Sequence, residues 1–310
     1  MIALWVLAMI AGFALMVLGS QRAVAGAREL AAGTRLPPMF IGVTFLAVGT
    51  DLPEIANSIA ASLGGHGDVN VGDSLGSAAT QATLVAGLLP WVAGPLVPEP
   101  RGVRRIGAAT VVALGCGAVL LADGTLGRLD ALLLVSAWAG ISVWLYRASI
   151  LEAGPGPPAA PTRRAPAAVR TAVALAVVAG AAVVALNGLI RVAEALGVPE
   201  FTVSFFAASI GTSLPELVFD ATAIRRGQVQ MAVGDVLGSS MVDATLSLGI
   251  GPLLAPTLID ADLAVIGAIT AAAALAVATL VLSSGRPHDR RTGSVLIVVY
   301  LAFYGLFLTR

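Results

Sequence analysis

The chain has 310 residues, of which 57% are hydrophobic and 12% are charged. Soluble domains are about 45–50% apolar and about 25% charged, so this composition excludes an ordinary soluble enzyme and a disordered chain. The basic residues are all arginine, and 18 of them balance 18 acidic residues. A neutral, apolar chain lacks the basic face that nucleic-acid binding requires. The composition therefore predicts an integral membrane protein.

Thiolate and imidazole metal sites are not expected. The single Cys116 lies in an apolar run, which excludes an internal disulfide framework. His66 and His288 are far apart in the sequence and flank apolar runs, so we expect both to be solvated loop residues. Residues 1–19 are apolar without a basic start, which favours a first membrane span over a signal peptide.

Ten apolar runs follow one another along the chain, and each can supply the roughly 20 residues that a membrane-spanning helix needs. The predicted spans are 2–19, 37–64, 70–94, 103–121, 127–146, 170–196, 199–226, 230–255, 260–283 and 292–308. Residues 151–168 are predicted to be a proline-rich linker. The sequence thus predicts an all-α integral membrane fold of ten transmembrane helices, with five in 1–150 and five in 169–310.

The distribution of arginine predicts the orientation in the membrane. With the N-terminus placed outside, fifteen of the eighteen arginines fall in inside loops, and only Arg128, Arg191 and Arg310 fall outside. Such an excess is typical of cytoplasmic loops. We therefore expect a multi-pass protein of a prokaryotic cell membrane with both termini outside.

Two sequence blocks occur twice with the same spacing. GTDLPE at residues 49–54 recurs 162 residues later as GTSLPE at 211–216, and VGDSLGS at 71–77 recurs at the same offset as VGDVLGS at 233–239. Because each half contains an odd number of spans, the second copy must enter the membrane from the opposite side. This inverted repeat is typical of secondary transporters, whose substrate site lies near the membrane midplane.

Glu54 and Glu216 lie within apolar, helix-forming sequence, where a charged side chain facing lipid costs about 2.5–3.5 kcal/mol. A carboxylate at a helix end that reaches for the interface is the plainer interpretation, but the placement occurs twice. Pro53 and Pro215 each remove a hydrogen bond to the carbonyl four residues earlier. A simple kink would explain the prolines but not the glutamates. Exposed carbonyls together with carboxylates make an oxygen ligand set that suits Ca²⁺ or Na⁺.

A polar stripe with four-residue spacing marks the next span of each half. The stripes are Asp73, Ser77 and Gln81 in the first half and Asp235, Ser239 and Asp243 in the second. Ser77 and Ser239 are equally compatible with ion ligation and with hydrogen bonds between helices. Asp243 is expected to face an ion.

Three further acidic residues have structural interpretations. Asp73 and Asp235 fall in the first turns of their predicted spans, so we expect them to cap those helices. Asp220 is expected near the inner mouth beside Arg225 or Arg226, and direct ion ligation is the less favoured alternative.

The paired blocks resemble the calcium/cation antiporter superfamily, which includes sodium/calcium exchangers and calcium/proton exchangers. The resemblance covers essentially the whole chain in layout. It implies a ten-helix fold with four ion sites between the second, third, seventh and eighth helices. It also implies alternating access by movement of the first and sixth helices past the core.

Carried over by position, this resemblance makes Glu54 and Glu216 the main calcium ligands. The other implied oxygen donors are Thr50, Thr212, Ser213, Ser77, Ser239, Gln81 and Asp243, with the carbonyls of Ala47 and Ser209. Two positions depart from the sodium/calcium exchanger pattern, since Asp51 replaces a usual serine and Gln81 a usual asparagine. The extra carboxylate of Asp51 could hold one more cation or carry a proton, so Na⁺ and H⁺ coupling both stay open.

The sequence thus predicts a secondary antiporter, not an enzyme, that exports Ca²⁺ in exchange for Na⁺, with Ca²⁺/H⁺ exchange as the alternative. We expect a monomer without a resident cofactor, whose partners are inorganic cations and the lipid bilayer. A passive cation channel is the rival, which a flux assay distinguishes. An intramembrane aspartyl protease would need glycine three residues before the aspartate, where this chain has Asn70 and Ala232.

Overall fold

The computed structural model describes residues 2–32, 37–153, 166–174 and 200–308, with isolated positions between 176 and 191. These residues are almost entirely helical, and one antiparallel pair, β1 (Thr125–Leu126) with β2 (Thr257–Leu258), is the exception. The helices outside the repeated region are α1 (Ile2–Ala32), α7 (Pro100–Leu120), η3 (Leu121–Asp123), α8 (Arg128–Ala153), α15 (Ala261–Leu282) and α16 (Arg290–Leu308).

One series of elements occurs twice. In the first half it runs α2 (Pro38–Ile41), η1 (Gly42–Leu46), α3 (Ala47–Thr50), α4 (Leu52–Gly64), α5 (Gly67–Thr80), η2 (Gln81–Val85) and α6 (Ala86–Val92). In the second it runs α10 (Glu200–Val203), η4 (Ser204–Ala208), α11 (Ser209–Thr212), α12 (Leu214–Arg225), α13 (Val229–Val242), η5 (Asp243–Ser247) and α14 (Leu248–Leu254). The η1, η2, η4 and η5 segments are π-helical. Each element of the second series begins 162 residues after its counterpart, as from Pro38 to Glu200.

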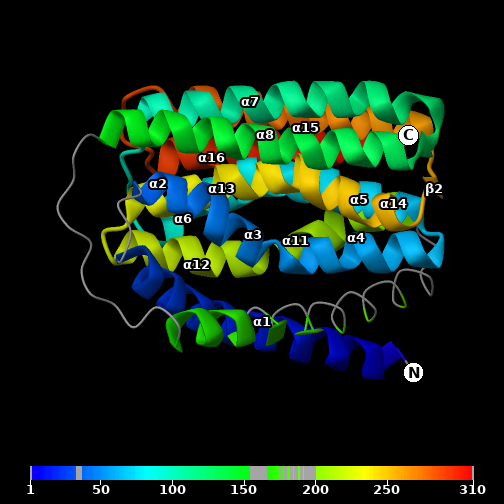
Figure 1. The fold of residues 1–310 in the computed structure, drawn as a ribbon, viewed down its shortest axis with the longest axis horizontal. Coiled ribbons are helices and arrows are strands. Elements are labelled where there is room, and N and C mark those ends of the chain that lie inside the picture. Colours follow the sequence, from blue (N-terminus) through cyan, green and yellow to red (C-terminus); the bar gives the residue numbers. More distant parts are fainter. Residues whose placement is uncertain are drawn as a thin grey trace.

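The repeated elements form the centre of the fold. In Figure 1, α7, α8, α15 and α16 lie along one side, α1 lies on the opposite side, and the repeated helices lie between them. The span formed by α5, η2 and α6 is 78% buried and the span formed by α13, η5 and α14 is 83% buried, whereas α8 is only 17% buried. The outer helices instead present apolar side chains such as Val119, 75% exposed, as lipid-facing residues do.

Among the described residues, five helical segments are long and apolar enough to cross a membrane. A sixth is added if residues 38–50 and 52–64, which meet at a bend of 45°, are taken as one broken span. The chain is therefore a multi-pass membrane protein.

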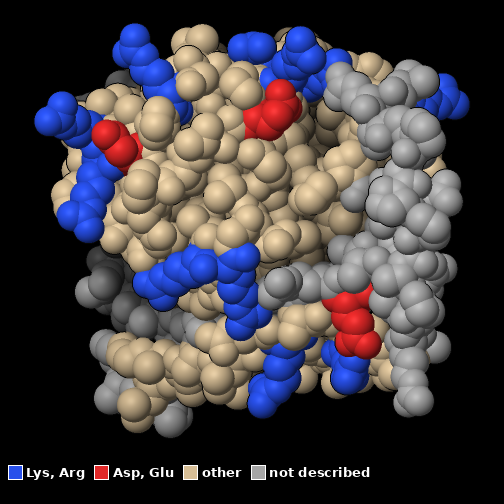
Figure 2. Space-filling view, turned by 90° about the vertical axis from the view of Figure 1, so that its left-hand side faces the viewer, with Lys and Arg blue, Asp and Glu red and all other residues tan. Residues whose placement is uncertain are grey.

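The two ends of the helix bundle differ in charge. At one end, named here the arginine end, α6 and α12 finish while α7, α13 and α16 begin. There, Arg225 donates to the carbonyl of Val92 at 2.6 Å, and Arg104 donates to that of Ser283 at 3.4 Å. Figure 2 shows this end, where several basic side chains stand on a mostly uncharged surface with few acidic residues. At the other end, named here the β end, β1 pairs with β2 and α4 finishes (Figure 1).

Most predicted spans agree with the observed helices, but three expectations need comment. The first helix is longer than predicted, because it continues past Gly19 to Ala32. The predicted linker 151–168 and the span 170–196 lie largely outside the described residues. For His288 the prediction of a solvated loop residue is wrong: the ring is 1% exposed, with Nε2 at 3.0 Å from the Ala86 carbonyl. Burial lowers the pKa of His288, since desolvation disfavours the charged ring.

Glycines let the two halves approach each other closely. A Cβ atom at Gly76 of α5 would lie 2.2 Å from the carbonyl oxygen of Phe205 in η4. A Cβ atom at Gly238 of α13 would lie 2.5 Å from the Cα of Val43 in η1. These contacts are related by the repeat, so each half inserts its π-helical turn against the small-residue face of the other half.

Replacing Gly76 with alanine is expected to destabilise the fold by about 1–3 kcal/mol, because the new methyl group would meet backbone rather than a movable side chain. The matched control is Gly140→Ala on α8, where an added Cβ has no neighbour within 4 Å. Thermal unfolding of the purified protein in detergent measures both. Equal unfolding midpoints for the two variants would show that the halves are not closely packed at Gly76.

Candidate cation site

Two helix breaks position the site. Pro53 and Pro215 have no N–H for the carbonyls of Gly49 and Gly211, and proline is well suited to the first turn of a new helix. The chain leaves helical geometry at Asp51, with ψ of 8°, and at the equivalent Ser213, with ψ of 3°. A new helix then begins in each half, α4 at Leu52 and α12 at Leu214. Two helix N-termini are thereby placed in the middle of the fold.

Glu54 and Glu216 occupy the first turns of these two helices. Glu54 is 1% exposed and Glu216 is fully buried. Neither carboxylate has a hydrogen-bond partner for its two oxygens within the described part of the chain. The first turn is the part of a helix whose free N–H groups and dipole favour a negative charge. The breaks therefore place the carboxylates where the backbone itself partly offsets their charge.

Three carboxylates come together at the centre. Asp51, Glu54 and Asp243 each offer one oxygen atom, and these oxygens lie within 4.8 Å of one another. Because Ca²⁺ binds oxygen at 2.3–2.6 Å, ligands on opposite sides of one ion are about 5 Å apart, so this spacing suits a shared cation. Glu216 is not one of the trio, but it lies beside Asp51 and Thr50. All of these side chains are buried.

Hydroxyl groups pair between the halves around this trio. Thr50 Oγ1 and Ser239 Oγ share a hydrogen bond of 3.4 Å, and the repeat-related Ser77 and Thr212 share one of 3.2 Å. Glu54 lies beside Thr212, as Glu216 lies beside Thr50. Four of the sequence-predicted residues thus form two symmetric pairs, each with one hydroxyl from each half.

Gln81 and Asp243 begin the π-helical turns η2 and η5, at equivalent positions of the two halves. Gln81 Nε2 donates to Asp51 Oδ1 at 3.4 Å, and Gln81 Oε1 has no partner among the described residues. Such π-helical turns often occur at functional sites. The side-chain amide of Gln81 therefore links the start of η2 to Asp51, the carboxylate whose counterpart in the second half is Ser213.

The remaining predicted donors line the breaks. The carbonyl of Ala47 accepts from the N–H of Asp51 at 2.9 Å, and that of Ser209 accepts from the N–H of Ser213 at 3.1 Å. Ser213 is 1% exposed, and its hydroxyl has no partner among the described residues. The structure brings the predicted site residues to the central region, with hydroxyls, carbonyls and carboxylates from both halves.

Three acidic residues do not lie where the sequence suggested. Asp73 and Asp235 do not cap their helices: each is the seventh residue of its helix and is buried. Asp73 accepts a hydrogen bond of 2.6 Å from Asn57. Asp220 is fully buried, and Arg225, which was expected beside it, donates to the carbonyl of Val92.

A signal for these positions exists in the sequence. Asp73 and Asp235 stand four residues before Ser77 and Ser239, at the start of stripes whose other members face the site. Because residues four apart share a helix face, the stripe should have been interpreted as one polar face. The predicted helix starts, three residues late for α5, made these aspartates look like caps.

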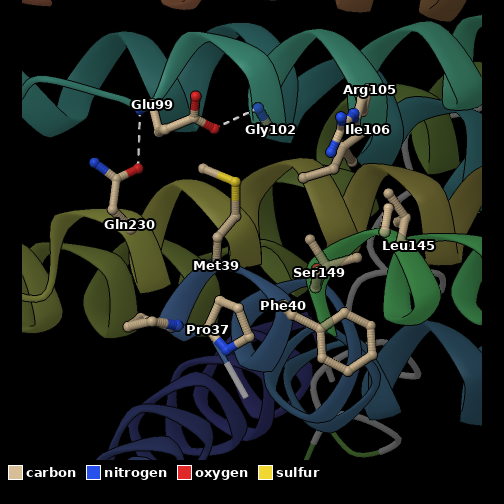
Figure 3. Close-up of a pocket in the computed structure, with 13 residues that line it drawn as sticks. Pro37, Met39, Phe40, Glu99, Gly102, Arg105, Ile106, Leu145, Ser149 and Gln230 are labelled. Carbon is tan, nitrogen blue, oxygen red and sulfur yellow. Dashed lines mark hydrogen bonds between the residues drawn. The ribbon is translucent and has the colours of Figure 1, made fainter. Parts of the chain in front are cut away.

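A separate cavity of about 290 Å³ lies at the arginine end and contains none of the predicted ligands. Figure 3 shows Glu99 at its edge, bonded to the backbone N–H of Gly102, while Gln230 accepts from the backbone N–H of Glu99. Met39 and Phe40 of α2 face the same space. Glu99 therefore caps α7, and the cavity belongs to the packing of this end rather than to the carboxylate trio.

Comparison with known proteins gives consistent matches. A family model described as sodium/calcium exchanger protein matches residues 4–147 and 167–309. The inner membrane protein YrbG of Escherichia coli (strain K12) is 30% identical over 262 residues, which cover 81% of this chain and 80% of that protein. The sodium/calcium exchanger MaX1 of Methanosarcina acetivorans is 34% identical over 112 residues, which cover 36% of this chain and 32% of that exchanger.

The fold is also that of a solved structure. The sodium-calcium exchanger NCX_Mj, soaked with 2.5 mM Na⁺ and 0.1 mM Sr²⁺, aligns with a TM-score of 0.75. The alignment covers 97% of this chain and 98% of that chain at 24% sequence identity.

Ca²⁺ is expected to raise the unfolding temperature of the purified protein in detergent. An ion that binds only the folded state stabilises it by about 2.7 kcal/mol at a hundredfold excess over Kd. Glu54→Gln should lose the part of this gain that the central site supplies, whereas Asp262→Asn, at an exposed position on α15, should keep the whole gain. The effect is measured by thermal unfolding with Ca²⁺ and with a chelator. If Ca²⁺ raises the unfolding temperature of Glu54→Gln as much as that of the unmodified chain, Glu54 is not a ligand.

Proposed function

Because the chain belongs to the sodium/calcium exchanger family, we propose that it exports Ca²⁺ from the cell in exchange for Na⁺, by alternating access at the central carboxylate site. The observation that carries the proposal is the buried trio Asp51, Glu54 and Asp243. Hard oxygen ligands of this kind suit Ca²⁺ and Na⁺. Exchange requires that two cations compete for one site, and the trio is one compact site.

Charge explains the coupling. Buried carboxylates without a counter-charge are unstable, so the empty site is disfavoured and one cation must replace another. Glu54 and Glu216, each backed by a hydroxyl of the opposite half, are the main Ca²⁺ ligands in this proposal. The remaining proposed donors to Na⁺ or Ca²⁺ are Asp51, Asp243, Thr50, Thr212, Ser213, Ser77, Ser239, Gln81, and the carbonyls of Ala47 and Ser209.

The proposed architecture is two inverted five-helix repeats, residues 1–150 and 169–310, joined by the linker 151–168. Figure 1 supports the inversion, since α4 runs from the centre toward the β end while the equivalent α12 runs toward the arginine end. The arginine end then faces the cytoplasm, as the excess of positive charge favours. Both termini lie outside in this arrangement.

Proton coupling is the second candidate, and one observation favours it. Asp51 adds a carboxylate where the equivalent residue of the other half, Ser213, is neutral. Asp51 Oδ2 is buried without a partner in the described residues. Carboxylates crowded into one site resist simultaneous ionisation, so a proton is a suitable counter-ion for Asp51.

Purified protein in liposomes is expected to take up ⁴⁵Ca²⁺ when an outward Na⁺ gradient is imposed, because Na⁺ leaving the site allows Ca²⁺ to enter it. Uptake that follows a pH gradient and ignores Na⁺ would reverse the choice of counter-ion. Uptake with no gradient of either ion would indicate a passive channel instead.

Glu54→Gln and Glu216→Gln are each expected to reduce exchange by at least about tenfold to a hundredfold, the range that loss of a group behind a metal ligand already costs. The amide has nearly the same shape, so the change tests charge rather than packing. Asp262→Asn is the control and should exchange like the unmodified chain. The measurement is Na⁺-driven ⁴⁵Ca²⁺ flux, and normal flux in either glutamine variant contradicts the assigned role of that glutamate.

A further inference from the structure

A second pair of acidic residues lies outside the proposed site. Asp220 on α12 and Asp235 on α13 lie side by side, and both are fully buried. All four of their carboxylate oxygens lack a hydrogen-bond partner within the described part of the chain. Neither residue belongs to the central trio or to the donors proposed around it.

The position of the pair is defined by its helices. Asp220 stands one turn after Glu216 on α12, which continues to Arg225 at the arginine end. Asp235 stands one turn before Ser239 on α13, which starts at the arginine end. The pair therefore lies between the central site and the arginine end.

Two adjacent carboxylates in a buried place must be neutralised, either by protons or by a cation. An unpaired buried charge costs several kcal/mol, and two like charges side by side add repulsion. The basic residue nearest in sequence, Arg225, is exposed and bonds to the carbonyl of Val92 instead. The described buried residues include no arginine. Among the described residues no basic side chain therefore supplies the counter-charge, and a bound cation can supply it.

The first half provides an internal comparison. Asp73 is the counterpart of Asp235, and its Oδ2 accepts a hydrogen bond of 2.6 Å from the amide of Asn57. Its Oδ1 lies 3.5 Å from the hydroxyl of Thr212. The chain itself thus supplies donors to Asp73. In the second half the neighbour of Asp235 is another carboxylate, which accepts where Asn57 donates.

We propose that Asp220 and Asp235 form a second cation-binding site that takes a divalent cation of the Ca²⁺ class. Two carboxylates carry the charge that one such ion cancels, and their oxygens are the ligands it prefers. A single shared proton would leave one negative charge buried. The choice of Ca²⁺ as the ion rests on the proposed function. The site gives the ion a binding position between the central trio and the arginine end.

The test uses the full-length chain in detergent and equilibrium dialysis with ⁴⁵Ca²⁺. The double variant Glu54→Gln with Glu216→Gln disables the central site, so the Ca²⁺ that stays bound reports on the pair. We expect this double variant to retain about one bound Ca²⁺ per chain, as one carboxylate pair can hold. Adding Asp220→Asn should remove it, because the amide gives Asp235 the donor that Asn57 gives Asp73. Adding Asp262→Asn instead should leave binding unchanged.

Two results would overturn the proposal. One is a double variant that binds no Ca²⁺, since the pair then holds protons only. The other is bound Ca²⁺ that survives Asp220→Asn in a chain whose unfolding temperature shows it is folded. Asp235→Asn is the second variant and should also remove the ion. Failure of exchange in liposomes with this binding intact would contradict the proposed function alone.

Discussion

The fold depends on burying several carboxylates in a membrane protein core without any buried arginine among the described residues. The buried acidic residues are Asp51, Glu54, Asp73, Glu216, Asp220, Asp235 and Asp243. Each uncompensated charge opposes folding, so the backbone, neutral donors and bound cations must together supply the compensation. The broken helices, the cross-paired hydroxyls and the small residues of α5 and α13 all serve this requirement.

The compensation differs from one carboxylate to the next. Glu54 and Glu216 sit at helix N-termini, where the dipole offsets part of their charge. Asp73 receives an amide donor from Asn57. Asp51 receives one amide donor from Gln81, whereas Asp243 and the pair Asp220–Asp235 have no hydrogen-bond donor within the described chain. Some buried acids thus have partners within the described chain and others do not, and this difference distinguishes structural carboxylates from candidate transport ligands.

The sequence was sufficient for what depends on local chemistry and on repetition. Apolar length predicted most helices, and the repeated Pro-Glu blocks predicted where α4 and α12 begin. The sequence did not predict two kinds of feature, the π-helical turns and the contacts between distant segments. The π-helical turns have no signal in the composition or in the spacing of apolar residues. The contact between Asp220 and Asp235 depends on how α12 packs against α13, and His288 is buried by a pairing of distant loops. The spacing of residues along the sequence does not predict such contacts between distant segments.

The reciprocal glycine contacts have a mechanical consequence. Gly76 packs against the π-helical turn that contains Phe205, and Gly238 packs against the π-helical turn that contains Val43. The hydroxyl pairs Thr50–Ser239 and Ser77–Thr212 also join the two halves. The two halves thus pack like the partners of a dimer, and the contact surface between them also holds the proposed cation ligands. Sliding one half along the other would change the ligand distances at once. Assembly of the protein and formation of its binding site are therefore a single event.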